Sequence, residues 1–338
     1  MGALLATGLL AGRPLPTFEH VSYLAPVGPA NAAMADSIPP ALQREEPAAL
    51  SFVRHEPAEA DDGSQRLREA NAWAHGRFAA PGNAVRRQVQ LRSISARTAD
   101  ELAGFFRQAS YTLGDVRQGE AVPPIRLDRI PADLANKDGS ERKSLFITAM
   151  LPVVLEVNQR VLADRQQLLY LRDKLALRPT SVTAIERLWL DELAQRYDGS
   201  PRDLDELLRR VDIVPPSMAI AQGGVESGWG TSPAARLNSL YGQLQFITRN
   251  GSTTPQPFGS VGDATAAYVA NLNTHPAYAA FRSARAALRE RGETLDGFHL
   301  IGSLLRYSEL GQDYVRFVRQ IMRENDLSDF DRARLSIF

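Results

Sequence analysis

Residues 215–235 contain a single ionisable side chain, Glu226, within a run of apolar, small and amide residues. Moving an unpaired charge out of water is unfavourable, so a carboxylate in such surroundings tends to hold its proton. A carboxylic acid that is protonated near neutral pH can act as a general acid. Glu226 is therefore the first side chain that a functional interpretation has to explain.

The composition bounds the class of protein. The chain has 338 residues, 44% of them hydrophobic, which suits one large or two ordinary globular domains. Lys plus Arg equal Asp plus Glu at 39 each, so nothing in the overall charge favours nucleic acid or an anionic membrane. Cysteine is absent, and none of the five histidines has the spacing of a metal-binding pair on a helix. We expect neither a metal nor a cofactor.

The N-terminal part has the character of a leader. Residues 3–12 resemble the apolar core of a secretory signal, and residues 30–32 resemble a small-residue cleavage site. This segment could direct export, or it could be a merely apolar start or a truncated anchor. The two interpretations are equally supported, because no basic segment precedes the apolar residues. From about 14 to 124 no sustained period is present, apart from a helix expected around 98–108. We assign residues 1–126 to a largely irregular leader and linker.

Helical periodicity starts after residue 137 and continues to the end of the chain. Ser140 suits an N-cap, and apolar residues then recur at helical spacing through about residue 174. Pro201 is expected at the first position of a helix. Further helices are expected at 183–197, 218–227, 264–272, 276–291, 295–307 and 312–323, with a short one after 231–233. Residues 243–259 are polar, with Gly and Pro interspersed, and suit a small hairpin. The sequence predicts an all-α domain with at most a small β-hairpin lobe.

The helix expected over residues 218–227 carries Glu226 at its C-terminal end, directly before Gly228. The negative end of a helix dipole disfavours an anion, and Trp229 and the other apolar neighbours solvate charge poorly. Both effects are expected to raise the pKa of Glu226. Glycoside hydrolysis needs an acid of this kind to protonate the leaving oxygen.

Simpler interpretations stay open at this point. A Glu near a helix end is more often a solvated residue, and Trp229 alone is more typical of a core than of a sugar-binding surface. The glycines between 223 and 230 lack the Gly-Lys-Ser/Thr of a phosphate loop. Ser227 lacks the Gly-x-Ser-x-Gly context of a serine hydrolase. Phosphate binding and serine catalysis are therefore poorly supported.

Several segments of the second half resemble one bacterial family. They are Leu-Asp-Arg-Ile-Pro at 127–131, the segment from Leu151 to Asn158, Ala-Gln-Gly-Gly-Val-Glu-Ser-Gly-Trp-Gly-Thr-Ser at 221–232, Asn-Ser-Leu-Tyr-Gly at 238–242, Tyr-Val-Ala-Asn-Leu-Asn-Thr-His-Pro-Ala-Tyr at 268–278, and the segment from Tyr307 to Tyr314. Together they resemble bacterial glucosaminidases with a mannosyl-glycoprotein endo-β-N-acetylglucosaminidase-like domain, in the Bax-type branch. The resemblance spans residues 127–338, which we take as the domain.

The resemblance implies a lysozyme-like helical fold and hydrolysis of a β-1,4 bond on the N-acetylglucosamine side of peptidoglycan glycan, with Glu226 as general acid. Peptidoglycan strands are then the expected partner. The expected location is the cell envelope, in the periplasm or at the periplasmic face of the inner membrane, with the N-terminus as a membrane tether. Eight residues are expected to shape the sugar-binding groove: Gln222, Trp229, Asn238, Tyr241, Gln245, Phe258, Tyr268 and Tyr307.

The chain also departs from the family pattern. Related enzymes often carry a second acid in the β-lobe and a Tyr shortly before the following Ser, whereas residues 243–259 hold no Asp or Glu and Phe258 stands at the Tyr position. Asp263 and Glu309 are the nearby acids, although each is more typical of a helix cap or a surface. The alternatives are assistance by the acetamido group of the substrate, a weaker enzyme, and a glycan-binding or envelope-assembly protein without activity. Among enzymes, a lytic transglycosylase also works with one Glu.

Overall fold

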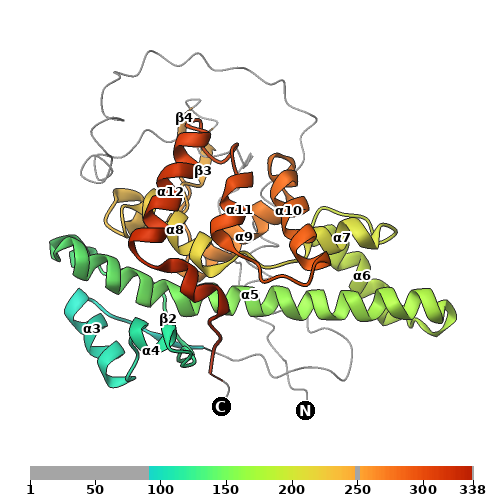
Figure 1. The fold of residues 1–338 in the computed structure, drawn as a ribbon, viewed down its shortest axis with the longest axis horizontal. Coiled ribbons are helices and arrows are strands. Elements are labelled where there is room, and N and C mark those ends of the chain that lie inside the picture. The colour runs from blue at the N-terminus through green and yellow to red at the C-terminus, as the bar shows by residue number, and fades with distance from the viewer. Residues whose placement is uncertain (1–90, 248–251, 337–338) are drawn as a thin grey trace, which may run out of the picture.

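One long helix, α5 (Gly139–Leu177), runs across the whole molecule (Figure 1). The computed structural model describes residues 91–247 and 252–336, so the segment at 3–12 lies outside the described residues. In Figure 1, helices α6 to α12 lie on one side of α5, and α3, α4 and the strand β2 lie on the other. The strands of the described residues are four short segments, which confirms the all-α prediction.

Residues 91–136 fold against α5. Their elements are β1 (Arg92–Ile94), α3 (Ala99–Gln108), α4 (Leu113–Arg117), β2 (Ile125–Leu127) and the 3-10 helix η2 (Ala132–Asn136). β1 and β2 pair in parallel, and Val122 forms a bridge to Leu335 near the C-terminus. The helix expected at 98–108 is confirmed. The rest differs from the loosely ordered chain expected up to residue 124, because apolar residues too widely spaced to form a period, such as Tyr111 and Val116, reach the core.

α5 is the central core helix. It begins after Asp138 rather than at Ser140, because the Asp138 carboxylate accepts the Glu141 N–H at 2.8 Å. It is long and apolar enough to cross a membrane, but 83% of its most apolar window is buried inside the protein. Helices α8 and α9 and the strand β2 cover it. This burial is typical of the central helix of a globular domain.

The chain after α5 continues with a 3-10 turn and two shorter helices. Its elements are η3 (Pro179–Ser181), α6 (Ala184–Arg196) and α7 (Leu204–Arg210). Thr183 and Glu186 form a reciprocal capping box at the start of α6, where the sequence predicts a helix. Asp203 caps α7 through the Glu206 N–H, so this helix starts after the predicted position Pro201.

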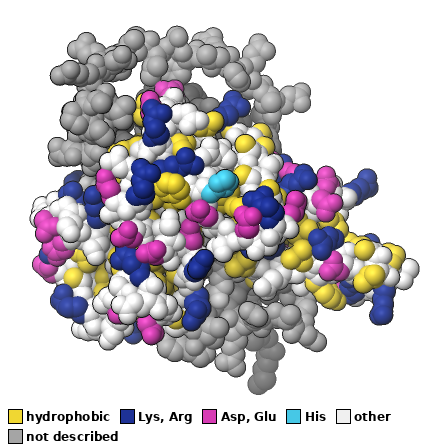
Figure 2. Space-filling model, in the orientation of Figure 1, with side chains coloured by type: hydrophobic (Ala, Val, Ile, Leu, Met, Phe, Trp, Pro, Cys, Tyr) yellow, Lys and Arg dark blue, Asp and Glu magenta, His cyan; other side chains and the backbone are white. Residues whose placement is uncertain are grey.

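Figure 2 shows basic and acidic side chains interspersed over one face of the molecule. This agrees with the formal net charge of zero. Large hydrophobic side chains stay exposed where α5 ends and α6 begins, most of all Leu177, which is 81% exposed.

Helix α8 (Pro216–Ser227) is buried at every residue except Glu226. It ends where Gly228 adopts the left-handed conformation (φ 57°, ψ 44°), as the sequence predicts. A β-carbon at Gly224 would lie 2.9 Å from the Trp229 ring, so only glycine lets that ring pack this closely against α8. α8 packs on α5 and is covered by α11, α12 and the 3-10 helix η7.

A 3-10 helix and a hairpin follow α8. They are η4 (Pro233–Leu237), β3 (Leu244–Ile247) and β4 (Ser252–Pro255). The two strands pair antiparallel, with Leu244 opposite Pro255. The small hairpin expected within residues 243–259 is confirmed.

The remaining chain is helical. Its elements are α9 (Val261–Thr274), η5 (Pro276–Tyr278), α10 (Ala279–Glu290), α11 (Gly297–Leu300), η6 (Ile301–Ser303), α12 (Gln312–Glu324) and η7 (Leu327–Arg332). The helix expected over 295–307 is shorter, because Leu304 leaves the helical conformation. The others lie where the periodicity predicts them.

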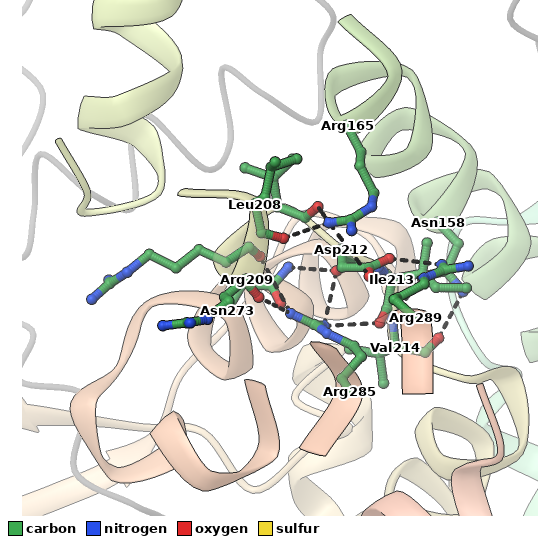
Figure 3. A network of polar contacts seen from close by, with 12 residues as sticks. Asn158, Arg165, Leu208, Arg209, Asp212, Ile213, Val214, Asn273, Arg285 and Arg289 are labelled. Carbon is green, nitrogen blue, oxygen red and sulfur yellow. Dashed lines mark hydrogen bonds and ion pairs between the residues drawn. The ribbon is translucent and has the colours of Figure 1, made fainter. Parts of the chain in front are cut away.

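A buried polar network holds the loop after α7 between α5, α9 and α10 (Figure 3). Asp212 is 2% exposed, and both of its carboxylate oxygens accept hydrogen bonds from Arg289, at 2.8 and 3.0 Å. Arg285, which is fully buried, donates to the backbone carbonyls of Asp212, Ile213 and Arg209. Arg165 lies 3.5 Å from the Asp212 carboxylate. Burial alone raises the pKa of Asp212, but Arg289, Arg285 and Arg165 together outweigh it and hold that pKa below its usual value.

This network predicts a large cost for Asp212→Asn. The variant leaves buried arginines without their counter-charge, so we expect the free energy of unfolding to fall by about 3–5 kcal/mol. Urea denaturation followed by circular dichroism measures it. Asp191→Asn, on the exposed side of α6, is the matched control and is expected to change stability by no more than about 0.5 kcal/mol. Equal losses in the two variants would contradict the role of the network.

Candidate active site

Glu226 lies in the last turn of α8, and its side chain is only partly exposed to solvent. Its Oε1 atom accepts a hydrogen bond from the Tyr314 hydroxyl at 2.9 Å. Tyr314 belongs to the first turn of α12 and is 3% exposed. A buried donor thus holds one carboxyl oxygen from the protein side.

The Tyr314 hydroxyl is the end of a longer hydrogen-bond chain. The Tyr268 hydroxyl of α9 donates to Gln222 Oε1 at 2.7 Å, and Gln222 Nε2 donates to the Tyr314 oxygen at 3.0 Å. Gln222 precedes Glu226 by one helical turn, so both side chains leave α8 on the same face. Each donor in the chain points toward the next acceptor, and the last acceptor is the carboxyl of Glu226. Such a chain fixes both the rotamer and the acceptor role of Oε1.

Burial raises the pKa of Glu226 to about 7, and the hydrogen bond from Tyr314 acts in the opposite direction without cancelling it. Burial also raises the pKa of Tyr268 and Tyr314 well above the usual tyrosine value, so both hydroxyls stay protonated as donors. Because Oε1 accepts from Tyr314, the proton of a neutral Glu226 is carried by Oε2. The site therefore presents a carboxylic acid near neutral pH.

The tyrosines around this series of hydrogen bonds form a stacked cluster. The rings of Tyr241 and Tyr268 are parallel with centroids 4.1 Å apart, and those of Tyr307 and Tyr314 stack at 5.6 Å. Tyr307 donates to the backbone carbonyl of Tyr241 at 2.8 Å. All four rings are at most 3% exposed. The predicted groove residues Tyr241, Tyr268 and Tyr307 therefore support the site from inside rather than offering a ring face to a sugar.

The other predicted groove residues are mostly buried as well. Trp229 is 5% exposed, and its ring packs edge to face on the Phe146 ring with the centroids 5.7 Å apart. Trp229 therefore belongs to the core, as is more typical of a tryptophan than a sugar-binding surface. Asn238 adopts a left-handed conformation and donates to the Phe258 carbonyl at 3.0 Å, so it fixes the chain on both sides of the hairpin. Gln245, on β3, is the member of the set that stays partly exposed.

The structure thus brings Glu226, Gln222 and Tyr268 together and adds Tyr314, which sequence reasoning does not single out. The signal for Tyr314 is its place at the end of the segment from Tyr307, which the family resemblance includes. Tyr314 and Glu226 are 88 positions apart in the sequence, so no local sequence pattern predicts their contact.

Within the described residues, no second carboxylate makes a hydrogen bond with Glu226. Asp263 lies in the first turn of α9, where its N–H is capped by Ser260, and Glu309 is exposed. No group of three His, Asp or Glu side chains suited to a metal ion occurs in the part of the chain that the structure describes. Among the described residues, the hydrogen-bonded support of the Glu226 carboxyl is therefore the neutral hydroxyl of Tyr314.

Comparison with known proteins identifies the family. Protein bax of Escherichia coli (strain K12) is 34% identical over 199 residues, which cover 55% of this chain and 71% of the bax chain. The chain belongs to the Bax family. No family model matches this Bax-family chain. No solved structure matches it either, so the lysozyme-like part of the fold stays a prediction.

The raised pKa predicts a pH-dependent cost in stability. A carboxyl with a pKa of about 7 in the folded chain and the ordinary value of about 4.5 when unfolded destabilises the fold as pH rises through this interval. Glu226→Gln removes the charge but keeps an acceptor for Tyr314. We expect the variant to be more stable than the wild type by about 1–3 kcal/mol at pH 8, since one pKa unit is worth about 1.4 kcal/mol and partial exposure reduces the total.

Urea unfolding at pH 5 and pH 8 measures this difference, which is expected to shrink to less than about 1 kcal/mol at pH 5, where fewer unfolded chains carry an ionised Glu226. Glu309→Gln, at an exposed position, is the control and is expected to behave alike at both pH values. A Glu226→Gln effect that is the same at pH 5 and pH 8 would rule out a perturbed carboxyl.

Proposed function

We propose that this chain hydrolyses β-1,4 glycosidic bonds of peptidoglycan, in the manner of an endo-β-N-acetylglucosaminidase, with Glu226 as general acid. The observation that carries the proposal is the carboxyl of Glu226: partly exposed, with a pKa near 7, and held on one oxygen by Tyr314. An acid that is protonated at neutral pH and fixed in orientation suits protonation of a leaving oxygen.

In this proposal, Glu226 Oε2 gives its proton to the glycosidic oxygen as the C1–O bond breaks. The positive charge that develops at C1 then needs a nucleophile. Among the described residues, no Asp or Glu makes a hydrogen bond with Glu226 or contributes to the shift of its pKa, so we assign this part to the acetamido oxygen of the substrate itself. Its attack on C1 forms a cyclic oxazolinium ion. Water then opens the ring, and Glu226, now a carboxylate, takes up the proton of that water.

A lytic transglycosylase is the second candidate, favoured because the pKa of Glu226 is shifted by burial and by Tyr314 and by no other carboxyl among the described residues. It breaks the same class of polymer with one acid but leaves 1,6-anhydro-muramic ends. A glycan-binding or envelope-assembly protein without activity is the third, favoured by the absence of Asp and Glu from residues 243–259 and by Phe258 at the position of the family's Tyr. The proposed place of action is the cell envelope, with the N-terminal region as a tether to the membrane.

We expect Glu226→Gln to lower the rate of fragment release from purified sacculi by about 10²–10⁴-fold, which is the usual contribution of a general acid. Wild-type activity should fall as pH rises through about 7, where the acid loses its proton. Mass spectrometry of the fragments should show free N-acetylglucosamine reducing ends. Full activity in the Glu226→Gln variant would refute the assignment, and anhydro-muramic ends would favour the transglycosylase.

Tyr314→Phe tests the support of the acid. The Tyr314 hydrogen bond lowers the pKa of Glu226, so its removal should raise that pKa further. We expect the falling limb of the pH profile of kcat/KM to move up by about 0.5–1 pH unit. Tyr111→Phe is the control, because the buried Tyr111 hydroxyl has no hydrogen-bond partner among the described residues. If the falling limb of the kcat/KM profile lies at the same pH in Tyr314→Phe as in the wild type, the Tyr314 hydroxyl does not act on the pKa of Glu226.

A further inference from the structure

A hollow lies where the Leu-Asp-Arg-Ile-Pro segment meets the chain on either side of the hairpin. It has a volume of about 560 Å³ and is lined by residues 94–97 and 128–132, together with Arg236 and Gly259. This volume lies within the range of about 300–1,000 Å³ that is usual for small-molecule sites. The hollow uses the Leu-Asp-Arg-Ile-Pro segment, for which the proposed reaction has no role.

The hollow has an apolar base and a basic rim. Ile94 and Ile130 are buried, at 5% and 6% exposure. Arg97, Arg129 and Arg236 line the same hollow and are exposed. An apolar base with exposed guanidinium groups suits a ligand that is partly apolar and carries negative charge.

Two of these arginines are not neutralised by any residue that the structure describes. Arg97 pairs with Glu101 at 3.5 Å. Arg129 and Arg236 make no ion pair with any of the described residues. Asp128, the acidic residue of the lining, is itself occupied by Arg126, at 3.3 Å. The uncompensated charge of the hollow is therefore positive.

The position of Arg129 is fixed by the fold. Its Nη1 atom donates to the backbone carbonyl of Arg236 at 3.0 Å, which joins the segment before α5 to η4. The Val261 N–H donates to the Asp128 carbonyl at 3.0 Å and holds the start of α9 against the same segment. The remaining N–H groups of Arg129 stay available, and a guanidinium group binds a carboxylate through two parallel hydrogen bonds.

The hollow adjoins the chain that leaves the Glu226 helix. A β-carbon on Gly230, four residues after Glu226, would lie 2.9 Å from Ile130 of the lining, so these two segments are in direct contact. Arg236 lies on η4, which continues from that turn, and Gly259 follows the hairpin. A polymer bound at Glu226 would therefore lie close to the basic hollow, because the chain that leaves α8 lines or contacts it.

We propose that the hollow binds the carboxylates of the peptide stems that peptidoglycan glycan carries, with Arg129 and Arg236 as the recognising groups. The proposal rests on the proposed function, because it names a part of the same substrate. Stem peptides join short apolar side chains to free carboxylates, which matches the apolar base and the basic rim.

The test is cosedimentation of the full-length Glu226→Gln protein with sacculi, which reports binding without turnover. Three preparations are compared: intact sacculi, sacculi whose carboxylates are converted to amides with carbodiimide and glycinamide, and sacculi stripped of stems by an amidase. The stripped glycan keeps a lactyl carboxylate on its sugar. We expect intact sacculi to bind about tenfold more tightly than either of the others, the scale of one charge-assisted contact.

Arg129→Gln/Arg236→Gln, added to Glu226→Gln, should remove this preference, and Arg236→Gln alone should weaken it without touching the contact made by the Arg129 side chain. Arg178→Gln/Arg202→Gln is the matched control: both side chains are exposed and unpaired among the described residues, so the same charge is lost away from the hollow.

The outcomes separate the two proposals. If stripped or amidated sacculi bind as tightly as intact ones, or if the control removes the preference as well, stem recognition by the hollow is wrong. If the preference depends on Arg129 and Arg236 while the wild type releases no fragments, stem recognition stands and the hydrolytic function fails.

Discussion

The burial of α8 is the constraint on which the site depends. This helix carries one ionisable side chain, packs on α5 and is covered by α11, α12 and η7. Its glycines allow that packing, since a β-carbon at Gly223 or Gly224 would crowd Tyr241 or Trp229. A carboxyl on the last turn of such a helix is drawn partly out of water by its neighbours. The fold itself therefore sets the pKa of Glu226.

A carboxyl removed from water needs a hydrogen-bond partner. In this protein the partner of Glu226 is a neutral hydroxyl, supported by a neutral amide, and not a cation. The chain from Tyr268 through Gln222 to Tyr314 orients Glu226 and leaves it able to hold a proton. A lysine or arginine in the place of Tyr314 would lower the pKa and favour the anion. The basic groups of the fold are used elsewhere, around Asp212 for stability and around Arg129 at the surface.

Local sequence rules predict much of this fold. Capping residues and helical periodicity place α5, α6, α8, α9, α10 and α12, and the otherwise uncharged stretch around Glu226 is enough to single out that residue. The rules do not report which way an aromatic ring points, so Tyr241, Tyr268 and Trp229 are expected in the groove but lie in the core. Contacts between distant segments, such as that of Tyr314 with Glu226, depend on how whole helices pack, and the periodicity of the sequence does not predict them.

The central claim is that the fold keeps Glu226 protonated near neutral pH. Carbon-13 NMR of protein labelled at the glutamate side-chain carboxyl measures this directly, with the Glu226 signal assigned by its absence in Glu226→Gln. A carboxyl that the fold keeps protonated gives this signal a titration midpoint near pH 7. A midpoint near pH 4.5, the value of an ordinary glutamate, would contradict it.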